Sequence, residues 1–291
     1  MKSFCLPIAA LALALISPSV NAQSAVQPGS PDYIPSTCLA VAQNIHKQDV
    51  PVRFASFSGE VPLVKTNGKY DVTISFQGHS TYLLESPGGV KIATDFAGWL
   101  TDPVTPDVVT MNQAHSSHYT RNPDPAIKHV LPGWRDDGQP AAYRLQVEDV
   151  VIRNITTDLV RFRPMPDGNS VFIFEMGGLC IGHLGHLHKR LSDAQYTEIG
   201  RLDVVMVAID GGLTLSHISV REVLDRLRSS VVLPMHVRSF DAMPRFLSYL
   251  GDDFAIERPK ERKLTLSLRT LPKRPTVIIL PGVASYAPSY D

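Results

Sequence analysis

The sequence predicts an α/β protein in which two layers of β-sheet carry helices on their outer faces. Three observations support this fold class. Apolar runs of strand length follow one another from about residue 70 to residue 112, with turn residues between them. After about residue 143, similar runs alternate with segments that show helical spacing of apolar residues. A length of 291 residues with 44% hydrophobic content is enough for one large core.

The first half of the chain is expected to form consecutive strands. The segment "YDVTISFQ" alternates apolar and polar residues, and "TYLLES", "VKIATDF" and "TPDVVTMN" come next. The turn "PGG" separates two of them. Because these connections are short, we expect a meander of neighbouring strands.

The second half alternates between strand and helix patterns. Strands are predicted at "YRLQVEDVVIRNITT", "SVFIFEMGGLCIGH", "LDVVMVAIDGG" and "SSVVLPMHV". Helices are predicted at "LSDAQYTEIGRL", where Ser192 stands at a capping position, and at "SHISVREVLDRLRS".

The N-terminus has the pattern of a secretory signal. Lys2 precedes the apolar run "CLPIAALALALI", and "SPSVNA" ends in small residues, which predicts cleavage after Ala22. The run is short for a membrane span, so we expect a secreted or periplasmic protein without stable membrane insertion, an uncleaved anchor being the alternative. Residues 23–68 are expected to form a tail and a short helix at "TCLAVAQNIHK", and residues 69–291 the main domain.

Two cysteines remain after the predicted cleavage. Cys5 leaves with the signal, and an oxidising compartment would permit a bridge between Cys38 and Cys180. Cys180 lies in the apolar run "GGLCIG", which favours a buried unreactive thiol.

The charges of the chain balance. Lys and Arg together number 28, as do Asp and Glu, so nothing in the composition indicates a nucleic-acid or anionic-membrane partner. We therefore expect a small-molecule substrate; the pattern does not specify an oligomeric state.

Histidines gather after the predicted strands. His115 and His118 follow "PDVVTM", His183 and His186 follow "GGLCI", and His236 follows "VVLPM". Imidazole is the commonest side-chain ligand of transition metals, and loops after strands are where α/β proteins assemble sites. The clusters indicate a metal site, with polar loop residues as the alternative. His188, before "KRLSD", is expected to face solvent.

The same stretches resemble the metallo-β-lactamase superfamily. "ISFQGHSTYLLES", "KIATDF", "PDVVTMNQAHSSH", "GGLCIGHLGHLHKRLSDAQ", "LDVVMVAIDGG" and "VVLPMHV" occur in the order of that family, over roughly residues 70–240. The nearest resemblance is to the branch that includes the ascorbate-phosphate lactonase-like hydrolases. It implies a four-layer αββα sandwich of two mixed β-sheets and a metal-dependent hydrolase.

The metal-binding loop departs from the family pattern. In the family's His-x-His-x-Asp-His stretch, Gln113 stands for the first His and Ser117 for the Asp. His115 and His118 match the second and the last His.

Later ligand positions are also altered. His183 and Gly185 match the His-x-Gly-Asp stretch, but His186 replaces its Asp. Thr157 stands near the place of the family's middle His, and His236 matches the last one.

These departures argue against a two-metal centre. A carboxylate can bridge two cations, whereas an imidazole normally binds one, and paired cations need anions nearby. The resemblance therefore implies one ion, zinc or else iron or manganese, held by His115, His118, His186 and His236. Residues that could orient these ligands are His79, Asp95, His183 and Asp210.

Each orienting residue also has a structural interpretation. A hydrogen bond at a strand end is favoured over direct ligation for His79, and His183 could hold its loop through a backbone carbonyl. Asp95 and Asp210 could cap loops. Trp99 and Trp134 lie in the candidate pocket loops 97–106 and 119–140, where they could line a pocket or pack on the sheet.

The sequence thus favours an exported hydrolase with an altered, mononuclear, His-rich site that activates water. The alternative is a catalytically inactive member of the fold that binds a ligand or metal without turnover, or binds no metal. The substrates of the family include lactones, lactams, thioesters and phosphodiesters, and the sequence does not choose among them.

Overall fold

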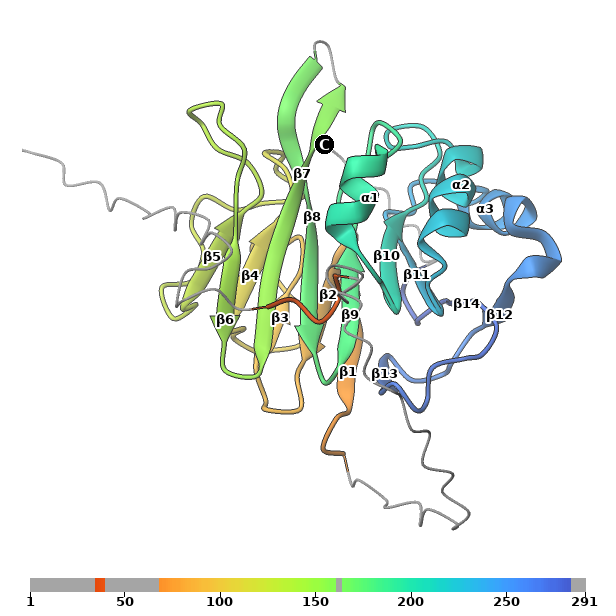
Figure 1. The fold of residues 1–291 in the computed structure, drawn as a ribbon, viewed down its shortest axis with the longest axis horizontal. Coiled ribbons are helices and arrows are strands. Elements are labelled where there is room, and N and C mark those ends of the chain that lie inside the picture. Colours follow the sequence, from red (N-terminus) through yellow and green to blue (C-terminus); the bar gives the residue numbers. More distant parts are fainter. Residues whose placement is uncertain (1–34, 40–67, 161–163, 284–291) are drawn as a thin grey trace, which may run out of the picture.

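Two mixed β-sheets pack face to face in the computed structural model, which describes residues 35–39, 68–160 and 164–283 (Figure 1). Together with three α-helices, they form the α/β sandwich that the sequence predicts. The predicted signal at 1–22 and most of the tail and helix at 23–68 lie outside the described residues. The first described strand begins at Val72, and the domain boundary at residue 69 stays a prediction.

The first sheet has six strands in the order β13-β1-β2-β3-β4-β5. β1, β2 and β3 form the predicted antiparallel meander, and β3, β4 and β5 run parallel. β13, from the C-terminal part of the chain, pairs antiparallel with β1. The bounds are β1 Val72–Gly78, β2 Thr81–Glu85, β3 Lys91–Ala93, β4 Val108–Met111, β5 His129–Pro132 and β13 Lys263–Leu266.

The second sheet has eight strands in the order β12-β14-β11-β10-β9-β8-β7-β6. β9, β10, β11, β14 and β12 run parallel, so the carboxyl ends of β9, β10 and β11 lie at one edge. The bounds are β6 Arg144–Val147, β7 Val150–Val160, β8 Pro164–Met176, β9 Leu179–His183, β10 Val204–Ala208, β11 Val231–Met235, β12 Ala255–Glu257 and β14 Thr276–Ile278.

The predicted strand at 143–157 is two strands. Glu148 and Asp149 form a turn between β6 and β7, and Glu148 has a φ of 48°. The strand pattern continues through this turn because Val147 and Val150 pair with each other across it. The residue types alone therefore do not reveal the turn between β6 and β7.

Three helices lie together beside β9, β10 and β11 (Figure 1). α1 (Asp193–Ile199) begins with a capping box in which the Ser192 side chain accepts from the Gln195 amide. α2 (His217–Leu227) is followed by α3 (Ala242–Leu250) and a 3₁₀ turn, η1 (Gly251–Asp253). None of the helices in the described part of the chain is long and apolar enough to span a membrane.

The main core lies between the sheets. Ile74 and Leu84 of the first sheet and Ile152 and Phe174 of the second are fully buried within one apolar cluster. Burial of apolar side chains on facing sheets is the main stabilisation of such a sandwich. It fixes the two sheets against each other and thereby fixes the distances between their strand ends.

A disulfide joins the N-terminal segment to the second sheet. Cys38 is bonded to Cys180 of β9, so the predicted unreactive thiol at Cys180 is wrong. Two hydroxyl groups reinforce this junction, because Ser36 Oγ and Thr37 Oγ1 donate to the buried Glu175 carboxylate. The same carboxylate pairs with Arg153 at 3.0 Å, so its charge is compensated.

The disulfide should contribute strongly to stability because it closes a loop with a sequence separation of 142 residues. We expect the Cys38→Ser/Cys180→Ser variant to lose about 2–5 kcal/mol of unfolding free energy. Urea unfolding of both proteins, with and without reductant, measures this loss. The wild type should be weakened by reductant and the variant should not. Equal midpoints for wild type and variant without reductant would contradict the assignment.

Candidate metal centre

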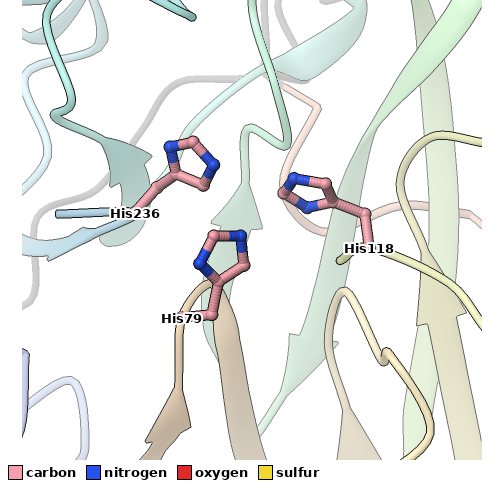
Figure 2. Close-up of side chains that lie close together, drawn as sticks. All are labelled: His79, His118 and His236. Atoms are coloured by element: carbon pink, nitrogen blue, oxygen red, sulfur yellow. The ribbon is translucent and has the colours of Figure 1, made fainter. Parts of the chain in front are cut away.

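Four imidazoles meet where strand ends of the two sheets approach each other. His79 follows β1 and His118 follows β4, whereas His186 follows β9 and His236 follows β11. The His236 ring centroid lies 4.5 Å from that of His79 and 4.8 Å from that of His186. The His118 centroid is 5.0 Å from each of His79 and His186. Figure 2 shows His79 between His118 and His236, the three rings reaching inward from different segments.

Two overlapping groups of side chains bring possible ligand atoms within 4.8 Å of one another. One group is His79, His118 and His236, and the other is His186, Asp210 and His236. The hydrogen bonds around each ring decide which nitrogen atoms face the site.

Asp95 fixes the orientation of His118. The Asp95 Oδ2 atom lies 2.5 Å from His118 Nδ1, and Asp95 Oδ1 accepts from the Asn112 amide at 3.1 Å. Burial would raise the pKa of this carboxyl, but the charge and hydrogen bond of His118 outweigh burial and hold the pKa below its ordinary value. Because Asp95 is ionised, His118 donates Nδ1–H to it. The Nε2 lone pair of His118 is then available to bind a metal ion.

Asp210 fixes His236 in the same way. His236 Nδ1 donates to Asp210 Oδ2 at 2.8 Å. The carboxylate also accepts from three backbone amides, of Gly212, Leu213 and Thr214, and from the Thr214 hydroxyl. Burial opposes ionisation, but the bonds to His236 and Thr214 lower the pKa of Asp210 well below its ordinary value. With its oxygens so engaged, Asp210 is placed to orient His236, and it also belongs to the second group of possible ligands.

His186 is oriented through a second histidine. His188 Nδ1 lies 2.6 Å from the Val160 carbonyl and 3.2 Å from the Val160 amide nitrogen, and the shorter contact favours Nδ1–H as a donor to the carbonyl. His188 Nε2 therefore accepts, and His186 Nδ1, 2.9 Å away, donates to it. Burial first, and then His236 and His118, lower the pKa of His186. His186 is thus neutral, with its Nε2 lone pair available. His188 is half-buried and lines the cavity.

His79 differs from the other three imidazoles in the environment of its ring. Its φ is 50°, in the left-handed region, and its carbonyl accepts from the His236 amide at 2.9 Å. Its Nε2 atom is buried and has no hydrogen-bond partner within the described part of the chain. Burial, followed by the neighbouring His236 and His118, lowers the pKa of His79 to about 3. A neutral imidazole with an unsatisfied buried nitrogen fits a metal ligand.

His183 acts on the loop after β9. Its Nδ1 accepts from the Gly185 amide at 3.1 Å, and its Nε2 bonds to the Ser80 carbonyl at 2.9 Å. Both ring nitrogens are therefore engaged, as the structural interpretation of this residue expects. Gly185 has a φ of 61°, and a Cβ there would lie 2.9 Å from the Ser170 carbonyl oxygen, so this position requires glycine.

The structure gathers His118, His186 and His236 of the predicted ligand set, but it does not bring His115 into either group. His115 Nδ1 lies 2.7 Å from Ser117 Oγ, and its ring centroid is 5.9 Å from that of His118. His79, predicted to orient the ligands, lies among the possible ligands instead. Its position after "FQG" in the sequence is the only signal that could have indicated this.

A cavity of about 420 Å³ opens above the rings. Trp99 lies beside a separate cavity, and Trp134 packs against Tyr119, so neither lines the opening above the histidines. The lining includes His115, His118, His186, His188 and His236, with Ser117, Val160, Leu213 and Arg238.

Comparison with known proteins agrees with this arrangement. A family model described as a β-lactamase superfamily domain matches residues 73–236, more than half of the chain. The chain belongs to the metallo-β-lactamase superfamily. The predicted superfamily is thereby confirmed, and the narrower lactonase-like branch stays a prediction.

Several solved structures are similar to this fold. A proposed Zn-dependent hydrolase of the metallo-β-lactamase superfamily from Thermotoga maritima is 29% identical, with a TM-score of 0.52, covering 72% of this chain and 98% of its own. Igni18, a metallo hydrolase from Ignicoccus hospitalis, is 18% identical with a TM-score of 0.48, covering 68% and 99%. A proposed metal-dependent hydrolase from Parabacteroides distasonis is 11% identical with a TM-score of 0.47, covering 62% and 89%. No curated protein sequence shows a significant match.

Substitution of Asp210 should weaken metal binding. In Asp210→Asn, one of the two carboxylate oxygens is replaced by an NH2 group. This NH2 group faces either the Nδ1–H of His236 or the backbone N–H groups, and in both orientations two donors oppose each other. His236 therefore loses its fixed orientation. We expect zinc affinity to fall by roughly 10–100-fold, measured by competition with a chelator. Asp225→Asn, which removes the acid of an exposed ion pair with Arg221, is the control and should leave affinity unchanged. Wild-type affinity in Asp210→Asn would contradict this role.

Proposed function

We propose that this protein is a hydrolase with one metal ion held by His79, His118 and His236, with His186 as a fourth imidazole. The observation that carries the proposal is the His79 Nε2 atom, which is buried and has no hydrogen-bond partner among the described residues. It lies beside His118 and His236, whose Nδ1 atoms are hydrogen-bonded to Asp95 and Asp210. The superfamily fold and the candidate metal groups support a metal-dependent hydrolase-like protein. The geometry favours His79 over His115 as a ligand.

The distribution of carboxylates favours one ion over two. Asp95 and Asp210 stand behind His118 and His236, on the side away from the cavity lining, with their oxygens engaged in hydrogen bonds. Ser117 replaces the acid of the family motif. Two cations a few ångströms apart repel strongly unless anions separate them. Neutral imidazoles alone are a set that suits a single zinc ion.

The chemistry of the proposed reaction divides between the ion and the protein. When bound, a divalent ion supplies Lewis acidity, which lowers the pKa of water and polarises the substrate. Asp95 and Asp210 hold the Nδ1 protons of His118 and His236, which keeps both rings in the ligand tautomer. His115 Nδ1 and Ser117 Oγ, both in the cavity lining, hold one proton between them where substrate would lie. The pair is thus placed to donate or accept that proton.

A protein that binds metal without turnover is the second candidate. The observation that favours it is the lining of the cavity, in which no carboxylate occurs among the described residues. A hydrolase without such a base depends on His115 and Ser117 for proton transfer. Turnover of lactone, phosphodiester and β-lactam substrates decides between the two candidates.

We infer that the chain is exported and cleaved after Ala22. The Cys38–Cys180 disulfide supports this inference, because disulfides persist mainly in oxidising compartments. Expression of the full chain in a bacterium, followed by fractionation and intact mass measurement, tests it. We expect a periplasmic or secreted product that begins at Gln23. A cytosolic product that retains residues 1–22 would refute export.

Metal content tests the proposed ligand set. The chain from Gln23, supplied with zinc, should contain about one zinc per chain by elemental analysis. His79→Ala and His118→Ala should lose most of this zinc because each removes an imidazole from the group. His115→Ala is the matched control and should retain it. If His115→Ala loses zinc while His79→Ala retains it, the proposed set is wrong, and a zinc-free wild type refutes the metal centre.

A further inference from the structure

One arginine at the cavity above the imidazoles has no charge partner among the residues that the structure describes. Arg238 lines this cavity and follows β11 by three residues. It forms no ion pair with any residue in the described ranges of the chain. Arginine is charged at every physiological pH, and an uncompensated guanidinium beside a small cavity is a ready binding group for an oxyanion.

Two carboxylates, one at the site and one close to Arg238 in the sequence, are engaged by other groups. Asp210, behind His236, accepts hydrogen bonds from His236, Thr214 and three backbone amides. Asp241, three residues after Arg238, pairs with Arg245 at 2.9 Å and accepts from Ser239. Neither carboxylate therefore compensates the guanidinium.

The lining of the cavity carries a positive charge, and the ionised Asp95 and Asp210 lie behind its imidazoles. Its described lining contains imidazoles, hydroxyl, amide and apolar groups, and Arg238 as the single permanently charged side chain. Arg238 lines the same cavity as His118, His186 and His236, so its charge lies beside the proposed metal centre. A divalent ion at the histidines would add further positive charge. A substrate that carries a negative group would compensate both, whereas a cationic one would be repelled.

The cavity also offers contacts for an uncharged part of a ligand. Val160 and Leu213 line it and are 41% and 53% exposed, respectively. A volume of about 420 Å³ is in the range of sites for small organic molecules.

We propose that Arg238 is a specificity-determining residue that binds a carboxylate or phosphate group of a small organic anion in this cavity. The proposal rests on the proposed function, because it names the substrate class of that site. The planar guanidinium donates paired N–H groups to the oxyanion and leaves the rest of the molecule against Val160 and Leu213. Arg238 thus positions substrate and takes no part in bond breaking.

Calorimetric titration with two probes, inorganic phosphate and succinate, tests this assignment. Wild type, Arg238→Gln and Arg238→Lys are compared, each in metal-free and zinc-loaded form. We expect Arg238→Gln to bind at least one probe roughly tenfold or more weakly in both forms, and Arg238→Lys to fall between. The probe that responds distinguishes phosphate from carboxylate recognition.

The matched control is Arg258→Gln, since Arg258 is an exposed arginine away from the cavity. It should bind both probes as the wild type does. Zinc content should be equal in wild type and Arg238→Gln, which shows that the metal centre is intact. Wild-type affinity of Arg238→Gln for both probes would overturn the proposal. So would an equal loss in Arg258→Gln or no measurable binding to the wild type.

Failure of this proposal is distinguishable from failure of the proposed function. If the wild type takes up no zinc or turns over no substrate, the proposed function fails, and the titrations of metal-free protein still decide the role of Arg238. If zinc binds but Arg238→Gln retains full anion affinity, the substrate class is wrong and the metal centre stands.

Discussion

Three hydrogen bonds between the two sheets set the geometry on which the candidate site depends. The His236 amide donates to the His79 carbonyl, His183 Nε2 to the Ser80 carbonyl, and the Tyr82 hydroxyl to the Pro234 carbonyl. They join the turn between β1 and β2 to β9 and β11. His79 and His236 both have positive φ, a backbone arrangement that persists only where surrounding contacts enforce it. Without these bonds the two rings would not lie 4.5 Å apart.

The placement of acids is the second organising feature. Asp95 and Asp210 lie behind the imidazoles and hold their outer nitrogens, so the inner nitrogens face the centre. Their negative charges stabilise the ligands from outside without entering the cavity. This arrangement accounts for a centre that is suited to one cation and for a cavity whose permanent charge comes from Arg238. The negative charge of an anionic substrate would then offset the positive charges of the metal ion and of Arg238.

Much of the fold was accessible from the sequence. Apolar runs of strand length predict β1 to β4 and β7 to β11, because much of each of these strands is buried, and Ser192 marks the start of α1. The pairing of β13 with β1 was not accessible, since it joins residues about 190 apart through contacts that no local pattern encodes. The sequence leaves the Cys38–Cys180 bond open for the same reason, because burial of Cys180 is compatible with a thiol or a disulfide.

The site was only partly predictable. His118, His186 and His236 follow strands whose ends meet, so their convergence follows from the strand order. His115 sits in the same loop as His118, yet it turns toward Ser117, a choice decided by loop geometry. The sequence favours a strand-end hydrogen bond for His79, and only the three-dimensional environment shows that its Nε2 atom is buried and unpaired among the described residues. Spacing identifies candidate ligands, whereas hydrogen bonds at the outer nitrogens distinguish the rings that can bind.

The most direct test of the central claim is X-ray absorption spectroscopy at the zinc edge of the zinc-loaded protein. A single ion held by imidazoles predicts a first shell of nitrogen and oxygen only, with scattering from three or four imidazole rings and no metal neighbour. A second metal at about 3.5–4 Å, the separation in two-metal sites, would contradict the account. A spectrum with fewer than three imidazoles would contradict it equally.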